Sequence, residues 1–377
     1  MRRVNVSRLT GPPRPLRVGG APVPVVGRVR MYVCGITPYD VTHLGHAATY
    51  LWADLADRVL RWHGHRVTLA RNVTDVDDVL YAEARRRGEQ ATMLATLQRA
   101  SFEATMATLR VRIPDHSPTA AQSVGYVVQL AAALLERGAA YRVGGTVYAR
   151  TSGAARAAGV DDARARDLAA EYRDRPDDPD KEHPLDVAVW QAGSGDEVSW
   201  PSPWGEGRPG WHAECAAMVL ALFGPTVDLH CGGADLAFPH HACEAALAEA
   251  ATGVHPFARA WLRAGTVHVD GAKMAKSAGN LVLVDDLLRT WSPAAVRMLC
   301  LNRPWSQAWD YTPQALDAAA AVLEDLYAAA ARAGGESGAP AVSEALREDL
   351  DVPRAVQVAL EEGGQAARTL VEMLALR

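Results

Sequence analysis

An apolar strand, a polar loop and a long amphipathic helix follow one another near the start of this chain. Residues 30–36 (RMYVCGI) are short, apolar and β-prone, and a Thr-Pro turn leads from them into residues 43–64, which carry helical periodicity. Residues 66–78 (RVTLARNVTDVDD) then predict a second strand that ends in a polar loop. Strand, helix and strand in this order predict a βαβ unit of a parallel sheet, and nucleotides bind at the carboxyl ends of such strands.

Two later apolar runs resume the sheet pattern, at residues 226–236 and 262–271, after a long stretch of Ala-rich and charged segments. We therefore expect a split α/β domain. Its first half, with short N-terminal strands, would span residues 1–110, a mainly helical connective insertion 111–205, and the second half 206–290. Residues 291–377 would form a C-terminal helical bundle with one strong amphipathic helix, a linker at 334–340 and a final helical pair near 343–377.

Composition limits the class of protein. Of the 377 residues, 49% are hydrophobic and 22% are charged, which is ordinary globular usage. No run approaches the roughly 18 to 20 apolar residues of a membrane span, and the start lacks the apolar run of a secretory signal, so we expect no membrane association and a cytoplasmic protein. The net charge of −5 creates no global attraction to nucleic acid, although it does not exclude a local basic patch.

A pair of motifs indicates phosphate chemistry. His43-Leu44-Gly45-His46 stands where the first strand passes into the first helix, and a helix N-terminus is a natural anion site. Alone the motif is weak, because two surface histidines would give the same pattern. Lys273-Met274-Ala275-Lys276-Ser277 follows the late strand on a glycine-flanked loop, where lysines suit the charge that develops on a triphosphate. The alternative is a solvated lysine loop.

The five cysteines are odd in number and far apart, so a disulfide framework is improbable. Cys34 precedes the first loop and Cys215 lies in GRPGWHAEC, while His240 and Glu244 are one helical turn apart. Two sulfurs, one imidazole and one carboxylate make a plausible zinc shell. A zinc ion that only stabilises the domain is the alternative, but the neighbouring nucleotide loop favours catalysis. The other three, Cys231, Cys243 and Cys300, are expected in the core.

Together the two phosphate motifs resemble the paired signatures of class I aminoacyl-tRNA synthetases, with Ala275 where that family usually has Ser. The cysteine-containing segments MYVCGITPYD and GRPGWHAEC resemble the zinc-binding cysteinyl-tRNA synthetases and their shorter relatives, the mycothiol cysteine ligases, in which the metal holds the substrate thiolate. The resemblance covers most of the chain. It implies a Rossmann-like class I synthetase catalytic domain in the α/β class, with a helical insertion and a C-terminal helical bundle.

The resemblance also implies roles for individual residues. The cofactors would be Zn²⁺ and the Mg²⁺ that accompanies ATP. The catalytic residues would be His43, His46, Lys273 and Lys276, of which the two lysines hold the triphosphate. The adenylate would contact Gly45, Thr49, Gly233, Asp235 and Val267 as well as both histidines. The bound cysteine would lie against Thr37, Thr74 and Trp211, and the metal would be held by Cys34, Cys215, His240 and Glu244.

Three departures separate this chain from a standard ligase. Glu244 completes a shell of four ligands as in the synthetases, where the ligases usually have a non-coordinating residue. Residues 171–176 (EYRDRP) replace the glycine-rich insertion signature of the ligases, which puts the acceptor in doubt. Cys231 replaces the usual third glycine before GGAD, which is a milder change.

We expect an ATP-dependent ligase that forms cysteinyl-AMP and transfers cysteine to the amine of an amino sugar, with glucosaminyl-inositol as the first candidate. A related amine from a natural-product pathway, a truncated cysteinyl-tRNA synthetase and a binding protein that has lost catalysis are the alternatives. Only 100 residues follow Ser277, which is little for an anticodon module, so tRNA is not expected as a partner. We favour a monomer.

Overall fold

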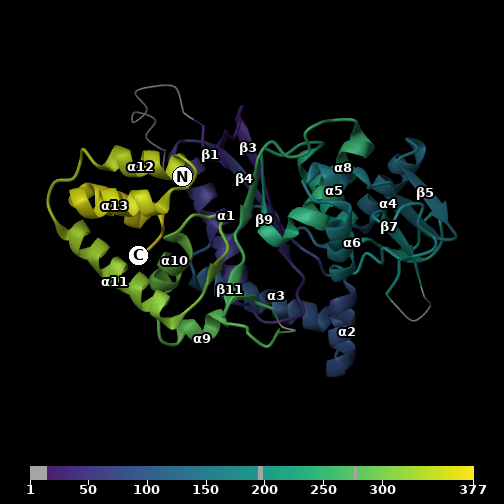
Figure 1. Cartoon of the computed structure of the whole chain (residues 1–377), viewed down its shortest axis with the longest axis horizontal. Helices are drawn as coiled ribbons and strands as arrows, with labels where there is room; N and C mark the ends of the chain where they lie inside the picture. The colour runs from purple at the N-terminus through teal and green to yellow at the C-terminus, as the bar shows by residue number, and fades with distance from the viewer. Residues whose placement is uncertain (1–14, 194–197, 276–277) are drawn as a thin grey trace.

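A four-stranded parallel sheet forms the centre of the computed structural model, which describes residues 15–193, 198–275 and 278–377. The strand order is β10-β9-β3-β4, and every neighbouring pair is parallel. Helix α1 connects β3 to β4, so the predicted βαβ unit is confirmed, as is the later pair of strands (Figure 1). The strands are β3 (Arg28–Ile36), β4 (Arg66–Val73), β9 (Leu229–Gly233) and β10 (Trp261–Ala264), and the helix is α1 (Leu44–Trp62).

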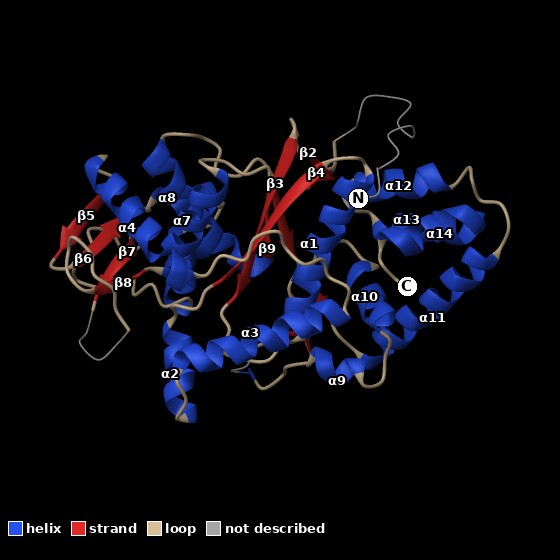
Figure 2. Ribbon diagram, turned by 180° about the vertical axis from the view of Figure 1, so that it is seen from behind, coloured by secondary structure: helices blue, strands red, loops and turns tan. Residues whose placement is uncertain are grey.

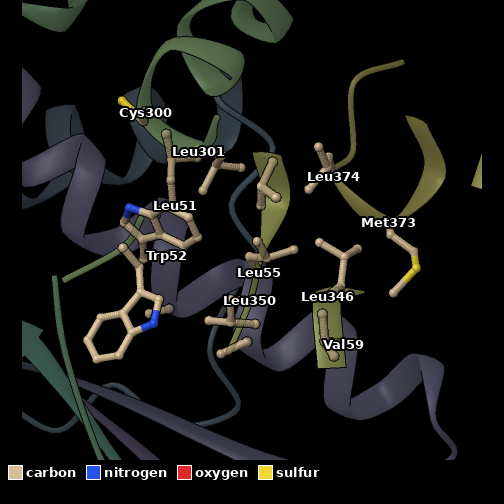
Figure 3. Close-up of a cluster of buried hydrophobic side chains, with 14 of the residues drawn as sticks. Leu51, Trp52, Leu55, Val59, Cys300, Leu301, Leu346, Leu350, Met373 and Leu374 are labelled. Atoms are coloured by element: carbon tan, nitrogen blue, oxygen red, sulfur yellow. The ribbon is translucent and has the colours of Figure 1, made fainter. Parts of the chain in front are cut away.

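Helix α1 joins the sheet to the C-terminal helices through one hydrophobic core. Its side chains Leu51, Leu55 and Val59 are fully buried, and Figure 3 shows them beside Leu346 and Leu374 of the C-terminal region. Apolar residues at helical spacing on α1 therefore face both the strands and the C-terminal helices. These helices are α10 (Pro293–Leu301), α11 (Pro313–Ala331), α12 (Ala339–Arg347), α13 (Val352–Glu362) and α14 (Gly364–Met373).

The region near 343–377 contains three helices, so the predicted pair was wrong in number. The second break falls at Gly363, whose φ of 64° is left-handed and suits a residue without a Cβ. The first falls at Asp349 and Leu350, also at positive φ, after which the Asp351 carboxylate accepts a hydrogen bond from the Arg354 backbone N–H and starts α13. Periodicity alone did not reveal these short interruptions.

The insertion contains an antiparallel sheet that the sequence analysis did not foresee. Its order is β5-β6-β7-β8, and Figure 2 shows it apart from the central sheet, with α4, α7 and α8 beside it. The insertion has its own hydrophobic cluster around Trp190 and Leu134. The predicted division at residues 110, 205 and 290 stays a prediction. The elements are α4 (Ala120–Glu136), β5 (Ala140–Val143), β6 (Thr146–Ala149), α5 (Gly153–Ala157), α6 (Asp162–Glu171), β7 (Val187–Ala192) and β8 (Gly207–Pro209).

Helix α7 (Trp211–Phe223) lies between the two sheets and so positions the candidate site. Ala213 and Ala217 belong to the hydrophobic cluster of the insertion, whereas Cys215 and Val219 pack with residues of β3 and β4. One helix thus contributes side chains to two hydrophobic cores. The remaining elements are β1 (Arg17–Val18), β2 (Ala21–Pro22), α2 (Asp78–Arg87), α3 (Ala91–Thr108), α8 (Ala242–Thr252), β11 (Val267–Val269), β12 (Ala272–Lys273), α9 (Val284–Leu288) and β13 (Trp309–Asp310).

Within the described ranges, no helix is both long and apolar enough to span a bilayer. The cysteines Cys34, Cys215, Cys231, Cys243 and Cys300 are all buried and free, in agreement with the expectation that they form no disulfide framework.

Candidate active site

Four buried side chains from three parts of the fold meet beside the carboxyl end of β3. Cys34 lies near the end of that strand and Cys215 on α7. His240 lies in the π-helical turn Ala237–His241 that leads into α8, and Glu244 lies in the first turn of α8. Their ligand atoms all lie within 4.8 Å of one another. The Cys34 sulfur is 3.8 Å from Glu244 Oε1, and His240 Nε2 is 3.7 Å from the same oxygen. The structure thus brings together all four residues that the sequence predicts as ligands; we call them the two-thiol set.

Burial opposes ionisation of the two thiols in the two-thiol set. It raises the pKa of the Cys34 thiol well above its usual range, and the adjacent Cys215 and Glu244 raise it further. Burial lowers the pKa of His240 to about 4, so this imidazole is neutral at pH 7 and can act as a ligand. A divalent cation would compensate the sulfurs and the carboxylate together and would deprotonate the thiols. Two sulfurs, one nitrogen and one oxygen are a donor set that zinc accepts.

Asn72, which the sequence did not single out, contacts the sulfur of one ligand candidate. Its Oδ1 accepts the Gly35 backbone N–H at 2.7 Å, which leaves its Nδ2 to donate to the Cys215 sulfur at 3.3 Å. Asn72 is 1% exposed, but β4 also carries Arg66, Thr68 and Arg71, so the sequence of the strand gave no signal that set Asn72 apart. A donor that faces a sulfur favours the thiolate form that a metal needs.

A second donor set overlaps the first. Cys34 and Glu244 also lie with His230 and His241 so that all four ligand atoms are within 4.8 Å of one another; we call this the two-imidazole set. His230 Nε2 is 3.4 Å from Glu244 Oε2, and both histidines are fully buried. The sequence analysis did not single out either histidine.

The predicted phosphate histidines stand at the N-terminus of α1. The His43 and His46 rings stack with their centroids 3.8 Å apart. Burial lowers the pKa of His43 to about 4 and that of His46 to about 3, so both are neutral at pH 7. Neutral rings can donate a hydrogen bond to phosphate without a net charge, and the helix N-terminus adds a positive partial charge. The Thr49 hydroxyl, one turn along, donates to the Gly45 carbonyl at 3.2 Å.

The lysine loop folds back onto the end of β9. Lys273 Nζ is 2.8 Å from Asp235 Oδ2, and although burial alone would lower the pKa of Lys273, this ion pair raises it above its usual value. Gly233 cannot be replaced freely here, because a Cβ would lie 2.3 Å from Asp235 Oδ1. The Met274 backbone N–H donates to the Val267 carbonyl and anchors the loop. Lys276 lies outside the described residues.

Two of the three residues expected around cysteine contact each other, and the third contacts a ligand candidate. The Thr74 hydroxyl donates to the Ile36 carbonyl at 3.1 Å, so it accepts from the Thr37 hydroxyl, 2.8 Å away. Trp211 stacks on the metal-ligand candidate His240, with ring centroids 4.2 Å apart. The indole ring therefore lies next to the two-thiol set.

Tyr172, which belongs to the segment that departs from the ligase signature, packs against Trp211. Its ring stacks on Trp211 with centroids 5.8 Å apart and an interplanar angle of 19°. Its hydroxyl donates to the Asp235 carbonyl at 3.2 Å and lies 3.5 Å from Lys273 Nζ. No local pattern in residues 171–176 shows that this segment reaches the site, so its role was not predictable from the sequence.

Comparison with known proteins agrees with this geometry. A family model described as the catalytic domain of class I (C) tRNA synthetases matches residues 23–321. The L-cysteine:1D-myo-inositol 2-amino-2-deoxy-alpha-D-glucopyranoside ligase of Parafrankia sp. (strain EAN1pec) is 45% identical over 93% of this chain and 82% of its own length. The protein of the same name from Thermomonospora curvata is 42% identical over 92% and 84%.

Among solved structures, Mycobacterium tuberculosis methionyl-tRNA synthetase in complex with methionyl-adenylate matches with a TM-score of 0.64. That match covers 93% of this chain and 82% of the other at 17% identity, so it concerns the fold. A putative arginyl-tRNA synthetase from Campylobacter jejuni matches with a TM-score of 0.56 at 13% identity, over 93% of this chain and 85% of the other.

Proposed function

The chain belongs to the class I (C) tRNA synthetase catalytic-domain family, and within it to the L-cysteine:1D-myo-inositol 2-amino-2-deoxy-alpha-D-glucopyranoside ligases; from this premise we propose that it activates cysteine with ATP and joins it to the amine of that amino sugar. The products are an amide, AMP and pyrophosphate. ATP as a co-substrate favours a cytoplasmic place of action.

The observation that carries the proposal is the position of the two-thiol set. It lies beside Trp211 and next to the strand end from which the loop to His43 and His46 begins. A metal there, with a cysteine thiolate on it, would leave the cysteine carboxylate close to the nucleotide loop. When bound, zinc supplies a soft Lewis acid that prefers a thiolate to a hydroxyl and so selects cysteine over serine.

The remaining residues of this chain bind and orient the reactants. We assign the N-terminus of α1 and the neutral His43 and His46 to the phosphates of MgATP, because charge that develops at the α-phosphate is stabilised by fixed donors. Lys273, now paired with Asp235, exchanges that partner for the triphosphate. The cysteine carboxylate attacks the α-phosphate, pyrophosphate leaves, and the acceptor amine then displaces AMP.

The test is mass spectrometry of mixtures that contain protein, MgATP, cysteine and one acceptor at a time. We expect a cysteinyl amide of glucosaminyl-inositol, and no product when serine replaces cysteine. Amide formation only with another amine would replace the acceptor in the proposal, and charging of tRNA would overturn the ligase assignment. A control without acceptor separates hydrolysis of the adenylate from transfer.

A further inference from the structure

The ligand candidate His240 is one end of a hydrogen-bonded chain that reaches into the insertion. His212 Nδ1 lies 2.9 Å from His240 Nδ1, and His212 Nε2 lies 2.9 Å from Asp174 Oδ2. His240 is 1% and His212 2% exposed, so protein groups rather than bulk water determine which ring nitrogens carry protons. The other nitrogen of His240, Nε2, is the one that approaches Glu244.

A metal on His240 Nε2 determines which ring nitrogen carries the proton in both histidines of this hydrogen-bonded series. A ring nitrogen that binds a metal carries no proton, so the proton of His240 must be on Nδ1 and must be donated to His212. His212 Nδ1 is then an acceptor, and its own proton must be on Nε2, where it is donated to Asp174. A carboxylate offers only acceptor atoms when ionised, and Asp174 therefore ends the chain in the direction that metal binding requires.

His241, in the two-imidazole set, is held by its hydrogen bond in a tautomer that does not suit metal binding. The Arg263 Nε–H donates to His241 Nδ1 at 3.3 Å, and because a guanidinium has donors only, His241 Nδ1 must accept. The proton of the neutral ring is then on Nε2, so neither nitrogen presents a free lone pair to a metal. His230 Nε2 lies 3.4 Å from Glu244 Oε2, and its Nδ1 has no hydrogen-bond partner among the described residues, so no donor forces its tautomer as Arg263 does for His241.

We propose that Asp174 is a positioning residue which, acting through His212, holds His240 in the tautomer that binds zinc. Together with the Arg263 contact, it directs the ion to the two-thiol set and away from the two-imidazole set. The inference rests on the proposed function in taking the ion to be zinc. Asp174 lies within residues 171–176, where the chain departs from the ligase signature, so the family resemblance gives it no role.

The test measures zinc affinity, by titration of metal-free protein in competition with a chromophoric chelator. Asp174→Asn introduces an amide that can donate to His212 and stabilise the wrong tautomer, so we expect zinc to bind about 10- to 100-fold more weakly. Asp174→Glu keeps a carboxylate acceptor and should recover much of the affinity. Asp177→Asn is the matched control, because it removes the same charge from an exposed position of the same loop and should leave the affinity unchanged.

Cobalt(II) in place of zinc reports which set is occupied, because the intensity of the thiolate-to-cobalt absorption scales with the number of thiolates. The wild-type protein should show two thiolates, and Cys215→Ser should show one. A one-thiolate spectrum in the wild-type protein would overturn the proposal, as would wild-type zinc affinity in Asp174→Asn.

If Asp174→Asn does not fold, His212→Phe provides the same test, since it keeps a ring in place but removes both hydrogen bonds; unchanged affinity in that variant would equally overturn the proposal. Failure of the proposed function has a separate signature. A wild-type protein that binds zinc, responds to the Asp174 variants as expected and yet forms no cysteinyl product would overturn the ligase activity alone.

Discussion

Arg297 is the most deeply buried charge that connects the catalytic core to the C-terminal helices, and its replacement by Met should strongly destabilise the protein. The side chain is fully buried on α10. Its guanidinium donates to Asp54 Oδ2 at 2.8 Å, to the Leu374 carbonyl at 2.7 Å and to the Leu109 carbonyl at 2.8 Å. These partners belong to α1, to the chain end after α14 and to the turn after α3.

The magnitude follows from what each partner loses. Arg297→Met leaves the Leu374 and Leu109 carbonyls without this donor, at about 1 to 3 kcal/mol each. Asp54 keeps the Arg58 guanidinium at 2.7 Å and the Arg112 backbone N–H at 2.9 Å, so its carboxylate is not left uncompensated. The sum agrees with the loss of about 3 to 5 kcal/mol that is typical when one member of a buried ion pair is removed.

Urea unfolding followed by circular dichroism measures this loss as a change in the free energy of unfolding. Arg58→Met is the comparison variant: its side chain bonds the same Asp54 carboxylate and one carbonyl, that of Arg110, but is 28% exposed, so we expect a smaller loss of about 1 to 2 kcal/mol. Hydrogen exchange should show the loss of protection first in residues 364–376. A free energy of unfolding for Arg297→Met within about 1 kcal/mol of wild type would refute the reasoning.

Three further outcomes follow from the site. Protein purified without chelator should carry close to one zinc per chain, and Cys215→Ala should lose it in elemental analysis; a metal-free wild-type protein would contradict the cysteine-selection argument. ATP–pyrophosphate exchange should require cysteine, exclude serine and need no tRNA. Lys276→Ala or His46→Ala should each cost roughly 2 to 4 kcal/mol of transition-state stabilisation. An unchanged exchange rate in these variants would contradict the roles assigned to the two residues. Because the pKa of the Cys34 thiol is raised, zinc must displace a proton there, so affinity should increase from pH 6 to pH 8 in a chelator competition; affinity independent of pH would show that the thiol is not a ligand.

The central sheet was predictable because its evidence is local. Each strand is a short run rich in buried residues next to a helix or a glycine turn, and parallel strands are buried on both faces. In the antiparallel sheet of the insertion, the hairpin β5–β6 has a local signal that the sequence prediction missed, because two β-prone runs are separated by Gly144-Gly145. The other pairings of this sheet are not local. Its strands β6 and β7 pair Ala149 with Val187, across a segment with two short helices, so only the tertiary structure identifies the partners.

The residues of the candidate site also differ in how far the sequence alone reveals their contacts. His240 and Glu244 are four residues apart on one helical face, and their relation is visible in the sequence. Asp174 and His212 are 38 residues apart, and His212 and His240 are 28 apart, with no periodicity to connect them. Reasoning from sequence therefore found the ligand candidates but not the groups that orient them.

The structure shows which residues the departing segment 171–176 contacts, and these contacts bear on its role. A loop far from the reaction centre could change without consequence for the substrate, but Tyr172 stacks on Trp211 and Asp174 contacts His212. The altered segment thus packs against a residue of the predicted cysteine site and is linked by hydrogen bonds to a ligand candidate. We therefore expect residues 171–176 to influence which acceptor amine the protein uses. The acceptor assay is therefore informative only if amines other than glucosaminyl-inositol are included.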